Sequence, residues 1–95
     1  WNAETAMSLS QDFHFTYRSP SQVEEFLHTF DNVANVDDRG EFFGFTAKAG
    51  PRFTFDCVIT PFGLRTDRAG EYFTFLGQFI EALTAKFGRV EVEDP

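Results

Sequence analysis

The sequence predicts a small α+β domain with two helices packed on one face of a four-stranded antiparallel sheet. Three observations support this fold class. The chain has 95 residues, which is the usual size of one domain. Its 14 phenylalanines recur every second residue in some segments, as in strands, and every three or four residues in others, as in helices. Turn-forming residues separate these segments, and the predicted elements follow one another in the order strand, helix, strand, strand, helix, strand.

The first strand is predicted over residues 12–18, where aromatic and polar residues alternate. The first helix begins at Ser19-Pro20, because serine caps a helix N-terminus and proline fits the first helical turn. The turn formers of residues 35–40 end it. The apolar stripe that would face the sheet consists of Val23, Phe26, Leu27, Phe30, Val33 and Ala34.

Two more strands are predicted over residues 41–49 and 52–60, and Gly50-Pro51 joins them into a hairpin. In the second of these strands, Phe55 and Cys57 fall on one face and the residues between them fall on the other. A buried thiol is unreactive, so we expect Cys57 to be structural rather than catalytic.

The segment after this hairpin allows two interpretations. An apolar stripe over residues 72–87 fits a single helix, with Thr66 or Asp67 as its N-terminal cap. Two glycines and a Tyr-Phe-Thr-Phe run lower the helix propensity of its first half. The alternative is therefore a strand over residues 71–76 followed by a helix over residues 77–87.

A final strand over residues 89–94 completes the predicted order. Right-handed crossovers would place both helices on one face of the sheet, with the first and third strands side by side. This arrangement resembles the ferredoxin-like topology, which hosts many unrelated functions and therefore implies none. We expect residues 12–95 to form the domain and residues 1–11 to form a tail, of which residues 1–6 are either native or an added extension.

The balance of charge excludes several classes of partner. Fifteen acidic residues against eight basic ones give a net charge of −7. Nucleic-acid affinity depends on Lys and Arg at the phosphates, and anionic membranes attract basic segments, so we expect neither as a partner. No apolar run reaches the ~20 residues of a membrane span. The lone cysteine allows no intrachain disulfide, which is typical of a cytoplasmic protein.

The sequence shows no motif for catalysis or for a cofactor. It has no glycine-rich phosphate loop, zinc-ligand spacing, nucleophile elbow or metalloprotease motif. The acidic turn after the first helix departs from a calcium loop, because Arg39 takes a ligand position. We therefore expect no cofactor, no metal ion and no catalytic residue. The sequence does not decide whether the protein is an enzyme, although the missing motifs favour a protein that is not one.

The candidate site is the face of the sheet that no helix covers. The residues expected to bind a partner there are His14, Thr16, Phe42, Thr54, Asp56, Val58, Glu91 and Glu93. We expect a non-catalytic protein that binds another protein through this face and through its acidic surface. The partner would be a basic protein or a second copy of the chain.

In size and charge the chain is similar to small acidic inhibitors such as bacterial immunity proteins, a likeness of composition only. A regulatory interaction domain would have the same profile. The alternative function is a small-molecule-binding module or minor enzyme. Its ligand would occupy a Phe-lined pocket between helices and sheet, with His14 as the polar group that contacts it.

Overall fold

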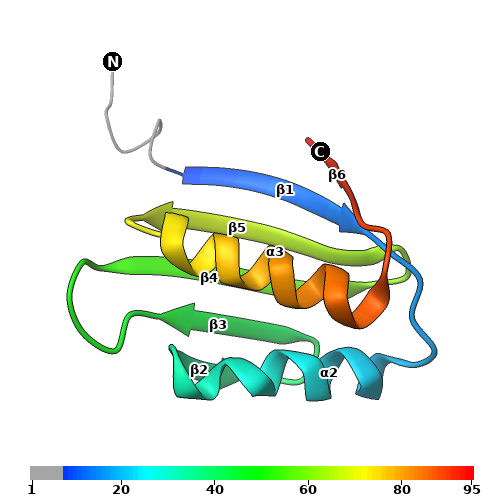
Figure 1. The fold of residues 1–95 in the computed structure, drawn as a ribbon, viewed down its shortest axis with the longest axis horizontal. Coiled ribbons are helices and arrows are strands. Elements are labelled where there is room, and N and C mark those ends of the chain that lie inside the picture. Colours follow the sequence, from blue (N-terminus) through cyan, green and yellow to red (C-terminus); the bar gives the residue numbers. More distant parts are fainter. Residues whose placement is uncertain (1–7) are drawn as a thin grey trace.

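Two layers make up the structure, a computed structural model that describes residues 8–95 (Figure 1). Within these residues, one layer is a sheet of six strands: β1 (Ser8–His14), β2 (Asn35–Asp38), β3 (Phe42–Thr46), β4 (Phe53–Thr60), β5 (Gly63–Gly70) and β6 (Glu91–Glu93). The other layer consists of helices α2 (Pro20–His28) and α3 (Phe73–Phe87), with the 3-10 helix η1 (Thr29–Asn32) continuing α2. Both helices lie on the same face of the sheet (Figure 1).

The strands follow the spatial order β2-β3-β4-β5-β1-β6, and every neighbouring pair is antiparallel. The α+β class agrees with the prediction, but the four-stranded ferredoxin-like sheet is wrong. The sheet has six strands, and β1 lies between β5 and β6 instead of beside β4. The correction comes from two strands, β2 and β5, that the sequence pattern did not indicate.

The sequence pattern does not indicate strand β5 because two of its three inward positions are polar, and only Leu64 is apolar. Thr66 and Arg68 point into the helix-covered side, where both are buried. The Thr66 hydroxyl donates to the Gln11 carbonyl at 2.9 Å, and the Arg68 guanidinium lies 5.0 Å from the Tyr72 ring centroid. Gly63 begins the strand at φ 142°, where a Cβ would collide with the Phe13 carbonyl oxygen. Thr66 is therefore part of a strand and not a helix cap.

The first part of the chain also differs from its prediction. β1 spans Ser8–His14 rather than residues 12–18, so half of it lies in the predicted tail, and residues 1–7 of that tail lie outside the described residues. The helix α2 ends at His28 and η1 continues the chain, which leaves Val33 40% exposed instead of packed inward. β2 lies where the turn was predicted. Its sequence Asn-Val-Asp-Asp is typical of a polar loop, so the pattern did not indicate a strand there.

The β3–β4 hairpin and the elements after β5 match the sequence pattern more closely. The hairpin of β3 and β4 is confirmed. The helix α3 is continuous over Phe73–Phe87, so the alternative strand at residues 71–76 is wrong. Gly88 ends this helix with φ 82°, and its amide donates to the Thr84 carbonyl at 2.9 Å. The last strand is confirmed in a shorter form, as β6.

The core lies between the helices and the sheet, and it is aromatic as predicted. Phe79 on α3 stands at its centre, with ring centroids 4.9–6.4 Å from several other phenylalanines. The phenylalanines buried in the core include Phe13, Phe15, Phe26, Phe30, Phe45, Phe55 and Phe79. Val90 packs against them partly buried, and Cys57 is fully buried among them. The second face of the sheet takes no part in this core.

Candidate functional site

The second face of the sheet has no helix over it, and we call it the open face (Figure 1). Its residues follow from alternation, because Phe55 and Cys57 of β4 point to the helices and Asp56 therefore points away. The strand register extends this assignment to the other strands. Among residues 8–95, the charged side chains at outward strand positions are Asp12, Asp37, Asp56, Asp67, Glu91, Glu93 and Arg65. Six of these seven are acidic.

The register divides the residues predicted to bind a partner into two groups. The central group is on β3 and β4: Phe42 is opposite Val58, and Asp56 and Thr54 follow along the strand. The edge group is on β1 and β6, and its members are His14, Glu91, Glu93 and Thr16. Thr16 lies beyond the end of β1 and belongs to no strand. The unpredicted strand β5 separates the two groups.

At the edge, the His14 ring stacks on Phe62 with centroids 4.4 Å apart. Its Nε2 atom lies 3.9 Å from a Glu93 carboxylate oxygen, which is too long for a hydrogen bond. Thr16 and Arg89 line the same shallow hollow, whose volume is about 310 Å³. The edge group is therefore assembled around His14, and the described residues that line this hollow include no serine or cysteine.

Between the two groups lies an ion pair that the sequence did not indicate. Arg65 on β5 donates from Nε and Nη2 to the two carboxylate oxygens of Asp12 at 2.8 and 2.9 Å. The Asp12 side chain is only 8% exposed, and the Arg65 guanidinium lies 5.8 Å from the Phe62 ring centroid. The hydrogen bond to Arg65 lowers the pKa of Asp12, and the same bond raises the pKa of Arg65. Among the described residues, the only Lys or Arg at an outward strand position is thus already paired with a carboxylate.

The neighbouring carboxylate has no such partner. Asp56 on β4 is directly opposite Asp67 on β5. No hydrogen bond or ion pair reaches Asp56 from any described residue. Burial, and then the negative charge of Asp67, raise the pKa of Asp56. The centre of the open face therefore has a carboxylate in an environment that disfavours its charge.

Beside Asp56 the open face is hollowed over Gly44, and we call this depression the Gly44 hollow. Its volume is about 270 Å³, and its lining includes Asp37, Arg39, Phe42, Gly44 and Asp56. The Arg39 Nε donates to an Asp37 carboxylate oxygen at 3.0 Å, and its guanidinium lies 6.0 Å from the Phe42 ring centroid. The sequence could have suggested Asp37 only if β2 had been recognised as a strand.

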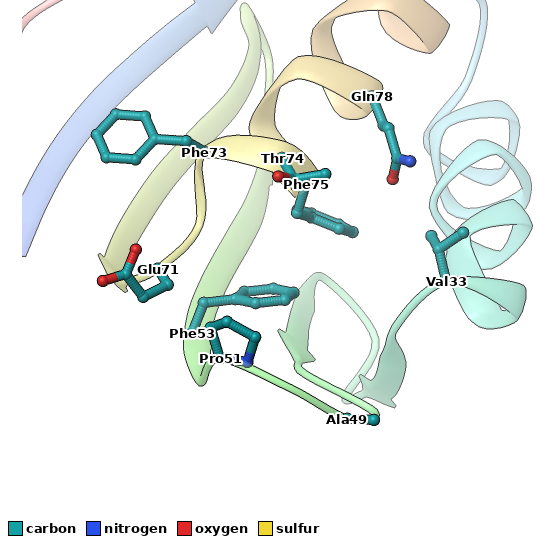
Figure 2. Close-up of a pocket in the computed structure, with 9 residues that line it drawn as sticks. All are labelled: Val33, Ala49, Pro51, Phe53, Glu71, Phe73, Thr74, Phe75 and Gln78. Carbon is teal, nitrogen blue, oxygen red and sulfur yellow. The ribbon is translucent and has the colours of Figure 1, made fainter.

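A larger cleft lies at one end of the helix layer, away from the open face (Figure 2). Its volume is about 480 Å³. Phe53 and Phe75 stack in it with centroids 5.1 Å apart, while Phe73 points away from them and is 70% exposed (Figure 2). The polar groups at this cleft are Glu71, Thr74 and Gln78, and His14 is not among its lining residues.

The part of the chain that the structure describes shows neither a metal site nor a membrane-spanning helix. No group of three or more His, Cys, Asp or Glu side chains there is placed to hold a metal ion. No helix there is both long and apolar enough to cross a membrane. The buried Cys57 has a pKa well above its ordinary value because of desolvation, so its thiol stays protonated.

Comparison with known proteins adds no further evidence. No protein-family model matches the chain, and neither the curated proteins nor the solved structures give a match. The functional inference therefore rests on the geometry and the charge of the surface.

Proposed function

We propose that this chain is a non-catalytic binding protein that holds a basic protein against its open face. The observation that supports this proposal is the imbalance of charge on an uncovered sheet. Six carboxylates and one guanidinium occupy the outward strand positions among the described residues, and the guanidinium of Arg65 is held by Asp12. A surface of one sign attracts a partner of the opposite sign and speeds its association.

The centre of the open face also has the apolar contact that a stable complex needs. Val58 is 38% exposed and lies opposite the half-buried Phe42 on the neighbouring strand. Protein interfaces commonly combine a small apolar centre with a polar rim. Asp56 is the next outward residue along β4, and Asp37 and Asp67 lie in the same row as Asp56. A basic partner would therefore bury the apolar residues and neutralise the acidic ones together.

The same charges argue against a second copy of the chain as the occupant. Two open faces placed together would oppose carboxylates to carboxylates, and like charges at an interface disfavour association. They also disfavour a nucleic acid, whose phosphates repel this face. A basic protein is the class of partner that satisfies the charge and the apolar centre at once.

A second candidate function is the binding of a small apolar molecule in the cleft of Figure 2. Its volume of about 480 Å³ is within the ~300–1,000 Å³ of typical ligand pockets. The stacked rings of Phe53 and Phe75 would form one wall for an aromatic ligand. This proposal differs from a catalytic site based on His14, because His14 lies at the β1–β6 edge of the sheet.

The test of the main proposal is a matched pair of variants used to capture partners. Thr54→Arg places a long cation at an exposed position in the centre of the open face, whereas Ala85→Arg makes the same charge change at an exposed position of α3. We expect the unaltered chain and Ala85→Arg to retain one stoichiometric basic protein, and Thr54→Arg to lose it. Equal binding by both variants would place the contact elsewhere.

A further inference from the structure

The geometry points to a specific contact within the open face: the Gly44 hollow accepts an arginine side chain of the basic partner, with Asp56 and Phe42 as its binding groups. This inference rests on the proposed function, since it names the group that the partner inserts. It also predicts which residues of the open face dominate the affinity.

The first argument is the glycine itself. Gly44 is in the middle of β3 and is not one of the glycines with positive φ, so the backbone there does not require glycine. A glycine inside a strand weakens it and often marks a place where a ligand approaches closely. A Cβ at this position would lie 3.4 Å from the Asp56 carboxylate and 3.4 Å from the Phe42 ring. The missing side chain therefore leaves room beside those two groups.

The second argument is that the hollow already binds a guanidinium on one wall. Asp37 and Asp56 flank Gly44, one on each neighbouring strand. Asp37, together with the Phe42 ring, holds the chain's own Arg39. Asp56 on the opposite wall has no cation among the described residues. A second guanidinium, from the partner, would complete the other wall.

The third argument explains why the group is arginine rather than lysine. A guanidinium is planar, stacks on aromatic rings and binds a carboxylate with two parallel hydrogen bonds. Both Arg–Asp pairs of this face place the guanidinium near an aromatic ring, with Phe62 beside Arg65 and Phe42 beside Arg39. The Arg65–Asp12 pair also has the two parallel hydrogen bonds, whereas Arg39 donates one to Asp37. The ammonium of lysine is a hydrated point charge and gains less from the Phe42 ring.

The environment of Asp56 is consistent with this occupant. Burial and the charge of Asp67 raise its pKa, so the carboxylate is poorly solvated before binding. An arriving guanidinium would replace the missing solvation and favour the ionised form. Binding should then lower the pKa of Asp56, and a proton should leave the protein when the complex forms at mildly acidic pH.

The experiment uses two blocked peptides of equal length and charge, one with alternating Thr and Arg and the other with alternating Thr and Lys. Each is titrated into the full ¹⁵N-labelled chain at low ionic strength, and the dissociation constant is taken from amide shifts. We expect the arginine peptide to bind about three- to fivefold tighter. The shifts should centre on residues 42–46 and 54–58.

Three variants identify the hollow. Asp56→Asn should weaken the arginine peptide and abolish its advantage over lysine, whereas Glu81→Gln, the same charge change at an exposed position of α3, should do neither. Gly44→Ala should also abolish the advantage while the unfolding midpoint stays unchanged or rises. Asp56→Asn provides the test independently if Gly44→Ala perturbs the fold.

The outcomes separate the two proposals. Equal affinity of the two peptides, with shifts still on the open face and lost in Thr54→Arg, would overturn the arginine contact and leave the proposed function standing. An Asp56→Asn variant no weaker than Glu81→Gln would also overturn it. Absence of any shift on the open face with either peptide would count against both.

Discussion

Alternate residues of β4 belong to two different environments. The inward side chains Phe55 and Cys57 are fully buried under the helices, among rings that contact one another at favourable angles. The outward Asp56 faces a second aspartate and has no cation beside it. The buried side chains of the inner face stabilise the fold, whereas the charge of Asp56 on the outer face destabilises it. Departures from the rules of stability in a small domain are expected where it binds something.

The open face repeats this contrast between two neighbouring rows. In one row Asp12 is paired to Arg65 with two hydrogen bonds, and in the next Asp56 lies opposite Asp67. Both rows cross the same strands, so the difference lies in the charges and not in the backbone. Asp56 is the member of this second pair that lines the Gly44 hollow.

The largest expected effect is on the free energy of unfolding, when residues at adjacent positions of β4 that belong to the two faces are each replaced by alanine. Phe55→Ala removes a fully buried ring and should cost about 3–5 kcal/mol of the free energy of unfolding. Thr54→Ala, at an exposed position, should change it by less than about 0.5 kcal/mol. Urea denaturation of both variants measures the difference. A cost below ~1 kcal/mol for Phe55→Ala would show that its placement in the core is wrong.

The fold should lose stability when the Asp12 carboxylate is removed from its pair with Arg65. The hydrogen bond to Arg65 lowers the pKa of Asp12 in the folded chain, so the ionised form stabilises the fold at neutral pH. This contribution is lost as the pH falls through the lowered pKa. Asp12→Asn should therefore lower the unfolding midpoint at pH 7, with the difference from the unaltered chain closing in strong acid. Denaturation at pH 7 and at about pH 2 checks both parts.

Removal of the Asp56 carboxylate should change stability with the opposite sign. The pKa of Asp56 is raised in the folded chain, so its charge destabilises the fold above that pKa, and the penalty disappears as the pH falls through it. Asp56→Asn should raise the free energy of unfolding at pH 7 by about 0.2–1 kcal/mol, which is the usual size of a cross-strand pair interaction, because like charges opposite each other destabilise a sheet. The gain should vanish near pH 3. Destabilisation at pH 7 would mean that Asp56 has a favourable partner.

The two faces also differ in how far the sequence could predict them. The aromatic core was predictable because phenylalanine alternates along β4 and recurs with helical spacing in α2 and α3. The strand β5 was not, since Thr66 and Arg68 both form hydrogen bonds to Gln11, which lies more than 50 residues away in the sequence. The open face was therefore predicted with Asp56 and Val58 in place but without the residues that β5 adds beside them.

The missing strands account for what was overlooked in the site. Asp67 and Arg65 belong to β5, and Asp37 belongs to β2, whose polar sequence is typical of a turn. Their positions depend on strand pairing across distant parts of the chain, which side-chain periodicity does not reveal. Charge composition predicted an acidic surface, but only the register shows that Asp56 lies between two other aspartates.

The smallest expected effect on stability compares thiols on the two faces. Cys57 is fully buried and desolvation raises its pKa, so the native chain should react with a thiol reagent slowly and reach one equivalent only in denaturant. Val58→Cys places a second thiol at a position that is 38% exposed in the unaltered chain. It should add one rapidly reacting equivalent and change the free energy of unfolding by less than about 0.5 kcal/mol. A single rapid equivalent in the unaltered chain would place Cys57 on the open face, and the alternation of β4 on which the whole comparison depends would have to be reversed.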